Sequence, residues 1–181
     1  MSDDKNKIAL SIRKAFIDDY DSIMLLQDDV ICNMSNKKWF CPSTSQEIKT
    51  FLENPQDYFA LVVAHGEMIV AFACLILNPS SCEDLYRDLK DNNIEVKTDK
   101  YCIFETVFVS PRYRGYSIQR TLINELCDLA FKNGKRSICA TVHPDNIYSM
   151  KNFEKSGFER VNSEPLPKYG GIRNYFVKDF M

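Results

Sequence analysis

Several features that mark special classes of protein are missing from this sequence of 181 residues. It has only two histidines, neither of them near paired cysteines, and its seven cysteines form no CxxC pair, so no metal site is expected. An odd number of cysteines, most of them inside apolar runs, predicts reduced thiols rather than a disulfide framework. The opening segment MSDDKNKIAL is acidic and polar, unlike a secretory signal peptide. No run approaches the ~20 apolar residues that span a bilayer, so the sequence predicts a cytoplasmic protein without membrane contact.

A general excess of basic charge is missing as well. The formal net charge is −2, so no broad positive field would attract nucleic acid, and any anion-binding site must be local. The apolar fraction of 45% and the charged fraction of 27% are ordinary for a globular protein. The length predicts a single domain over residues 1–181, with a polar insertion at 78–100 that holds a short helix.

Apolar periodicity predicts an alternation of strands and helices. The expected elements are a strand at 8–15, helices at 18–34 and 43–54, two strands within 57–77 broken at 65–67, a strand at 101–109, a helix at 117–134, a strand at 136–142, a helix at 145–157, and strands at 158–163 and 172–180. Asp18, either Ser43 or Thr44, and Asp145 are the expected helix N-caps. Because most strands are continuous apolar runs, helices should cover both faces of the sheet. The predicted fold is therefore a mixed, three-layer α/β domain.

The stretch VFVSPRYRGYSIQRTLINEL, residues 107–126, is the most informative part of the sequence. A strand ends at a proline, and a turn with Arg112, Arg114 and Gly115 leads into an amphipathic helix. The first turn of a helix presents unpaired N–H groups and a partial positive charge, which makes it a natural anion site. Gly115 lets the backbone approach a ligand closely, and Ser117 is small enough to stand there and to cap the helix. The alternative is that both arginines are solvated surface residues.

Two common phosphate-binding loops do not fit this turn. A Walker loop requires GxxxxGK[ST], which is absent, and the Rossmann pattern GxGxxG fails at Ser117 and Arg120. By contrast, RYRGYS resembles [Q/R]xxGx[G/A], the pyrophosphate loop of the GCN5-related N-acetyltransferase (GNAT) superfamily, with a serine where glycine or alanine is usual. TVHPDNIYSMKNFEKSGFE similarly resembles the strand and helix that come next in that family, and the order of the upstream elements also matches.

This resemblance implies an acyl-CoA N-acyltransferase fold that binds acetyl-CoA as acyl donor, without a metal. The pantetheine arm would lie between the strands at 101–109 and 136–142, the pyrophosphate on the amides of 114–119, and the thioester oxygen near the N–H of Val109. The residues expected to contact the cofactor are Val107, Val109, Arg112, Arg114, Gly115, Tyr116, Ser117, Ile118, Gln119, Asn146, Ser149 and Phe153. Asn146 has an alternative role as a simple helix cap.

Glu105 is the candidate general base. It is the one charged residue of the apolar strand YCIFETVFV, where desolvation should raise its pKa toward neutrality. A base is needed because an amine acceptor with a pKa of ~10 arrives protonated. The alternative is a structural glutamate that is paired with an arginine or with backbone amides, or that points to a solvent-exposed edge.

Phe153 departs from the family pattern. It stands on the helix face of Asn146 and Ser149, where the family usually has a tyrosine that protonates the leaving thiolate. Either water or another group such as Tyr148, Tyr169 or Ser149 supplies that proton, or the protein binds acyl-CoA without transferring the acyl group.

Three functions remain open at this stage. The first is an N-acetyltransferase that acts on a primary amine of a small molecule or peptide, the second is a non-catalytic acyl-CoA-binding or sensor domain, and the third is an interaction module that has lost the cofactor. Trp39, Phe40, the 78–100 insertion, Tyr169 and Arg173 are candidates for contact with the acceptor, although packing, surface or homodimer roles suit them equally. His143 is expected to be a loop histidine without a role, and His65 to be exposed in a hairpin turn.

Overall fold

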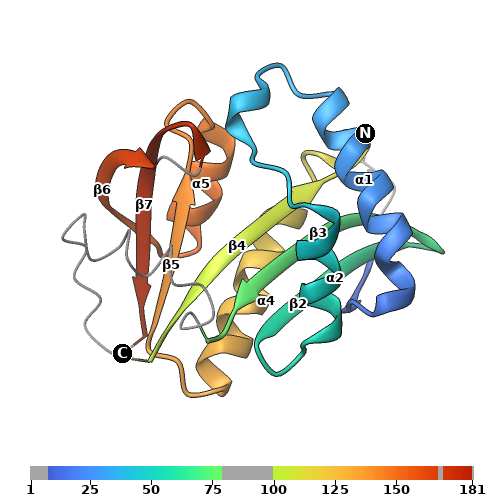
Figure 1. The fold of residues 1–181 in the computed structure, drawn as a ribbon, viewed down its shortest axis with the longest axis horizontal. Helices are drawn as coiled ribbons and strands as arrows, with labels where there is room; N and C mark the ends of the chain where they lie inside the picture. Colours follow the sequence, from blue (N-terminus) through green and yellow to red (C-terminus); the bar gives the residue numbers. More distant parts are fainter. Residues whose placement is uncertain (1–7, 79–99, 167–168, 181) are drawn as a thin grey trace, which may run out of the picture.

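Seven strands form one mixed sheet in a computed structural model that describes residues 8–78, 100–166 and 169–180 (Figure 1). The strand order is β1-β2-β3-β4-β5-β7-β6, and β4 and β5 are parallel whereas the other neighbours are antiparallel. The strands are β1 (Ser11–Lys14), β2 (Tyr58–His65), β3 (Met68–Ile76), β4 (Tyr101–Val109), β5 (Ser137–Val142), β6 (Glu159–Leu166) and β7 (Gly171–Asp179).

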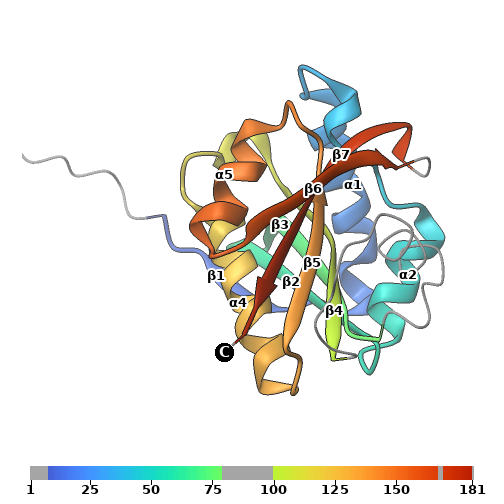
Figure 2. The same cartoon turned by 90° about the vertical axis from the view of Figure 1, so that its left-hand side faces the viewer.

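Helices cover both faces of this sheet, which confirms the predicted three-layer α/β fold. Figure 2 shows α1 (Tyr20–Cys32) and α2 (Ser45–Glu53) on one side, with α4 (Ile118–Lys132) and α5 (Ile147–Lys155) on the other. The central strands β2 and β3 are buried over most of their length, as expected for apolar runs between two helical layers. The insertion predicted at 78–100 lies almost wholly outside the described residues.

Each helical layer packs an apolar stripe onto the sheet. In α1, Ile23, Leu26 and Val30 recur at helical spacing and are buried against one face. In α4, a similar stripe that includes Leu122 and Leu126 packs on the opposite face. Burying one such side chain contributes roughly 1.5–3 kcal/mol, so these two stripes hold the layers and thereby fix the position of the strand ends between them.

Two predicted helix caps were wrong. A 3-10 turn precedes α1, so the helix starts at Tyr20 and Asp19 takes the N-cap position predicted for Asp18. The Asp19 carboxylate is held by Arg13 at 2.7 Å and accepts the Phe16 N–H at 2.9 Å. For α2, the alternative Thr44 is correct, since Thr44 and Glu47 form a capping box.

The second wrong cap lies at the start of α5. The side chain of Asn146 accepts the Ser149 N–H at 3.2 Å, so Asn146 rather than Asp145 is the N-cap. The chain turns one residue later than expected because the Asp145 N–H donates to His143 Nδ1 at 3.1 Å. This shift places Asn146 at the sheet end, where the strands β4 and β5 approach α5.

Candidate active site

The parallel strands β4 and β5 separate part-way along their length. Their paired residues run from Tyr101 with Ser137 to Phe104 with Ala140, and β4 then continues to Val109 without a partner on that side. β5 stays paired with β7 up to its last residue. In Figure 1 the two strands lie side by side at one end and diverge toward the other. The separation leaves an open backbone edge on β4.

Glu105 occupies an irregularity at the start of this separation. On the opposite edge of β4, Leu75 of β3 pairs with Phe104 and Cys74 pairs with Thr106, so Glu105 is the extra residue of a β-bulge. Bulges re-aim side chains, and Glu105 is half-buried between two buried neighbours. The bulge thus brings a carboxylate to the mouth of the gap.

Backbone N–H groups of β4 face the same gap. The N–H of Ser110 donates to the carbonyl of Val70 in β3 at 2.9 Å, so it points away from the gap. Because successive residues of a strand direct their N–H groups to opposite edges, those of Val107 and Val109 point into the gap. They supply preorganised donors along an edge that has no neighbouring strand.

A cleft of about 100 Å³ opens where the strands separate. Its walls come from the loop between α1 and α2, the bulged part of β4, the end of β5, the first turns of α5 and the start of β7. Among the residues that line it are Trp39, Glu47, Glu105, Val107, His143, Asn146, Ser149, Phe153, Tyr169 and Arg173. Five of the predicted site residues thus share one cleft, namely Glu105, Val107, Asn146, Ser149 and Phe153.

The turn between β4 and α4 presents a run of free backbone amides. The N–H groups from Gly115 to Arg120 donate no hydrogen bond to any residue that the structure describes. Gly115 and Ser117 have left-handed φ values of 88° and 61°, and a Cβ built on Gly115 would meet no atom within 4 Å. Free amides in such a turn, with a helix dipole behind them, form an anion-binding arrangement.

Ser117 does not cap the helix with its side chain as predicted, whereas the amide of Ile118, the group that was expected to contact the cofactor, stays free within the described residues. Ser117 occupies the N-cap position of α4, but its side chain makes no capping hydrogen bond and lies 3.3 Å from the Arg120 guanidinium instead. Its left-handed backbone is unusual for a residue with a side chain, and it explains why a glycine would suit this position. The side chain of Ile118 is 4% exposed and belongs to the core, so only its amide faces a ligand.

The side chains of Arg112, Arg114 and Tyr116 are exposed on the turn. Within the described parts of the chain, neither arginine forms an ion pair. Both guanidinium groups are therefore free to meet an anion at the amides of the turn.

Tyr113, which was not among the predicted site residues, anchors the turn to the β2–β3 hairpin. The Tyr113 side chain is 9% exposed, and its hydroxyl lies 2.7 Å from Nδ1 of His65 in the β2–β3 hairpin. The pair also makes an edge-on ring contact with centroids 5.7 Å apart. His65 is exposed, as expected, but it has a role in holding the turn on the sheet. The spacing of the arginines gives no hint of such an anchor, because the hairpin lies far away in the sequence.

A polar network joins the turn to the cleft. Gln119 at the start of α4 donates to Ser149 Oγ at 3.1 Å and accepts from Asn152 at 2.8 Å. Ser149 N–H in turn donates to the Asn146 side chain. Because Ser149 Oγ accepts from Gln119, its own hydroxyl proton remains free to donate into the cleft that Ser149 lines. The first turns of α4 and α5 are thus held as one unit.

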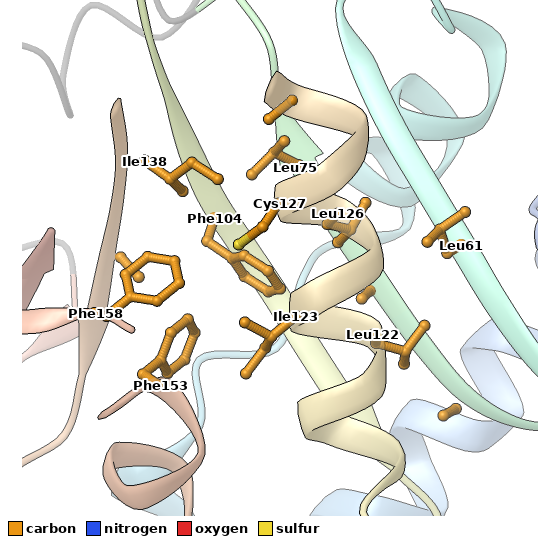
Figure 3. Close-up of a cluster of buried hydrophobic side chains, with 14 of the residues drawn as sticks. Leu61, Leu75, Phe104, Leu122, Ile123, Leu126, Cys127, Ile138, Phe153 and Phe158 are labelled. Atoms are coloured by element: carbon orange, nitrogen blue, oxygen red, sulfur yellow. The ribbon is translucent and has the colours of Figure 1, made fainter. Parts of the chain in front are cut away.

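Phe153 is an integral part of the apolar core. Figure 3 shows its ring among the side chains of the α4 layer, next to Phe104 and Phe158. The ring centroids lie 5.2 Å from Phe104, 5.0 Å from Phe158 and 6.1 Å from Phe176. The side chain is 2% exposed and also lines the cleft floor, so an apolar surface stands where a tyrosine hydroxyl is usual in the resembled family. Tyr148 is 71% exposed and does not line the cleft, so it is no substitute.

Two ionisable side chains of the cleft are held in their neutral forms. Burial lowers the pKa of His143, and the nearby charge of Arg173 adds to this effect. Since His143 Nδ1 accepts the Asp145 N–H, the proton of the neutral ring lies on Nε2. Burial also raises the pKa of Tyr169, with a further contribution from the Glu105 carboxylate. Both groups therefore act as hydrogen-bond donors near neutral pH.

Potential metal ligands are scattered among the described residues, and one cysteine lines the cleft. Among the described residues, no group of three or more potential ligands is placed to hold a metal ion. Cys41 lines the cleft and forms no disulfide, and Cys139 is buried with its pKa raised by desolvation to about 12. No helix of the described residues is long and apolar enough to cross a membrane.

Comparison with known proteins identifies the family. The model of the acetyltransferase (GNAT) family matches residues 28–158, which include the bulge, the free amides and the helix with Phe153. The chain belongs to the acetyltransferase (GNAT) family. Its members are N-acetyltransferases, so the resemblance seen in the RYRGYS turn and the enzyme class that it implied are both confirmed. A comparison with curated protein sequences gives no significant match.

Solved structures show the same fold at low sequence identity. A GNAT-family acetyltransferase from Streptococcus pneumoniae superposes with a TM-score of 0.72 at 15% identity, covering 96% of this chain and all of that one. The yncA protein of Salmonella typhimurium, solved with acetyl-CoA, gives 0.68 at 17% identity over 94% of each chain. The PaiA N-acetyltransferase of Thermoplasma acidophilum, solved with coenzyme A, gives 0.69 at 14% identity, covering 95% and 99%.

Proposed function

We propose that this GNAT acetyltransferase uses acetyl-CoA as its acyl donor, acts as one domain, and acetylates a primary amine of a small molecule. The proposal rests on two neighbouring sets of backbone groups, one in the turn before α4 and one on the open edge of β4. The free amides from Gly115 to Arg120 suit a pyrophosphate, and the open edge of β4 suits the amides of the pantetheine arm. Together they lead from the turn into the cleft. When bound, acetyl-CoA supplies an acetyl group activated as a thioester.

Acetyl transfer needs a base for the ammonium proton, donors for the charge on the carbonyl oxygen, and a proton for the leaving thiolate. Residues of this chain can supply all three. Glu105 takes the proton from the incoming ammonium group, directly or through one water, because its carboxylate lines the cleft at the bulge. The N–H groups of Val107 and Val109 face the gap and stabilise negative charge on the carbonyl oxygen. Ser149 Oγ–H is the donor available to the leaving thiolate, whose pKa of ~8.5 makes its departure the least demanding need.

The second candidate is a non-catalytic acyl-CoA sensor, which Phe153 favours. A buried, four-ring aromatic cluster replaces the hydroxyl that would protonate the thiolate. The sensor and the enzyme share the cofactor site, but only the enzyme passes the acetyl group to an amine after binding. Release of free CoA thiol that depends on an added amine separates them.

The test is that release, measured on the wild type and on Glu105→Gln with a panel of primary amines. The variant should lose roughly 10²–10⁴-fold in turnover near neutral pH while keeping its acetyl-CoA affinity. The loss should shrink as the pH rises toward the amine pKa of ~10, because the acceptor then arrives unprotonated. Glu125→Gln, on the exposed face of α4, is the matched control and should behave like the wild type.

Unchanged turnover in Glu105→Gln would remove Glu105 from the mechanism. Binding of acetyl-CoA without thiol release for any amine would favour the sensor.

A further inference from the structure

Arg173 places a buried positive charge in the wall of the cleft. It stands near the start of β7, lines the cleft and is 5% exposed. Its guanidinium donates only to backbone carbonyls, at 3.2 Å to Lys38, 3.4 Å to Tyr169 and 3.4 Å to Ile172. These contacts and the ring of Tyr169, whose centroid lies 5.4 Å from the guanidinium carbon, fix the side chain but bring no full negative charge to it.

No carboxylate of the described residues forms an ion pair with Arg173. Glu164 is its register partner on β6, yet no salt bridge joins them. Burial lowers the pKa of Arg173, which indicates a charge held away from water. An unpaired buried charge destabilises a protein, so charges in such positions are normally paired with an opposite charge. An anionic group of a ligand would supply the missing partner.

Trp39 contributes a second buried donor to the residues that line the cleft. Its indole Nε1 is buried and has no hydrogen-bond partner in the described structure. Trp39 lines the same cleft and directly follows Lys38, whose carbonyl accepts from Arg173. Buried polar groups are nearly always satisfied, so an orphaned donor in a ligand cleft points to an acceptor brought by the ligand.

Two carboxylates line the same cleft. Glu105 is placed there by the bulge, and Glu47 by the first turn of α2. Tyr169 lies within electrostatic reach of both signs: besides burial, the charges of Glu105 and Glu47 raise its pKa, whereas the charge of Arg173 lowers it. The cleft therefore holds both carboxylates, one of them the candidate base, and the cation of Arg173, all within electrostatic reach of Tyr169.

We propose that the acceptor is a free amino acid, whose carboxylate binds Arg173 and Trp39 while its amine lies at Glu105. This inference rests on the acetyltransferase function proposed above and names the substrate class of the same site. The amine nitrogen forms a bond to the acetyl carbon and the bond between carbon and CoA sulfur breaks. The ammonium group loses two protons: one passes to Glu105 or water, and the other replaces the proton that the thiolate takes from Ser149 Oγ–H, so that CoA leaves as the thiol.

The first test compares each of a set of L-amino acids with its own primary carboxamide in the wild-type enzyme. The two differ only in the carboxylate, and the amide has the more acidic ammonium group, which favours its reaction. A charge-assisted contact to Arg173 should nevertheless give the acid an advantage of about 10- to 100-fold in kcat/KM. Equal kcat/KM for acid and amide would overturn the inference and leave the enzyme proposal standing.

The second test uses the Arg173→Gln variant. The preference for the acid should fall toward one, mainly through a higher KM for the amino acid, while the acetyl-CoA Kd stays the same. Arg173→Lys should keep part of the preference, and Arg160→Gln, an exposed arginine on β6, should keep all of it. A preference that survives Arg173→Gln contradicts the assignment of Arg173.

If a variant of Arg173 fails to fold, the inference is still tested, because the comparison of amino acids with their carboxamides uses only the wild-type enzyme. Absence of turnover with every amine, in a protein that binds acetyl-CoA, would overturn the proposed enzyme and this inference together.

Discussion

Replacing Gly115 by alanine tests whether the turn before α4 holds a phosphate. Its φ of 88° costs an L residue roughly 1–2 kcal/mol, and the added methyl group meets no protein atom within 4 Å. The damage to the fold should therefore be modest. A methyl group at this position stands where a ligand approaches the free amides, and losing one or two charge-assisted hydrogen bonds of about 1.5–3 kcal/mol each raises the Kd by ten-fold or more.

Gly134 provides a matched control. It follows α4 at its far end with a φ of 77°, and a Cβ there also meets nothing within 4 Å. Gly134→Ala should lower the melting temperature about as much as Gly115→Ala, because both place alanine in a left-handed conformation. Only Gly115→Ala should weaken acetyl-CoA in a calorimetric titration. Equal affinities in the two variants would refute the phosphate site at this turn.

Three further changes probe the surroundings of the cleft. Asn146→Ala removes the cap of α5 and should cost ~1 kcal/mol, or about 2–4 °C in the melting temperature, whereas Asn146→Asp should keep the cap; equal losses in both would contradict the capping role. Since the pKa of His143 is lowered in the folded state, the unfolded state binds more protons, and stability should fall as the pH drops below the unfolded value of about 6.5. His143→Gln should flatten that part of a pH series of thermal melts, and an unaltered slope would exclude His143 as the cause. Phe153→Tyr should lower stability by about 1–3 kcal/mol if its hydroxyl stays unpaired among the aromatic rings, with little effect on kcat; a clear rise in kcat would show that protonation of the thiolate limits the wild type.

The layers of the fold were predictable from the sequence because buried strands and half-buried helices have characteristic patterns of apolar residues. Continuous apolar runs marked β2 and β3 as central strands, and the stripe of Ile23, Leu26 and Val30 marked a helix with one buried face. The helix caps were less predictable. Asp18, Asp19, Asp145 and Asn146 are all good capping residues, and side-chain hydrogen bonds of Arg13 and His143, which lie six and two residues from their partners, decide which residue takes the position.

The candidate site was predictable where it is local in sequence and unpredictable where it depends on packing. The turn at Gly115 and the face of α5 with Asn146 each lie within one short segment. The bulge at Glu105 depends on how β3 pairs with β4, which no local pattern encodes. Likewise, the pairing of Tyr113 with His65 depends on contacts between segments far apart in the chain.

The central claim is that the free amides of the turn and the open edge of β4 bind acetyl-CoA. A thermal-shift titration with acetyl-CoA and CoA, with pantetheine and ATP as partial ligands, tests it most directly. At 100-fold its Kd a ligand adds ~2.7 kcal/mol to the stability of the folded state, which corresponds to several degrees for a chain of this size. We expect a clear shift with both CoA species and little with either partial ligand at equal concentration. No shift with acetyl-CoA or CoA would contradict the account of the site.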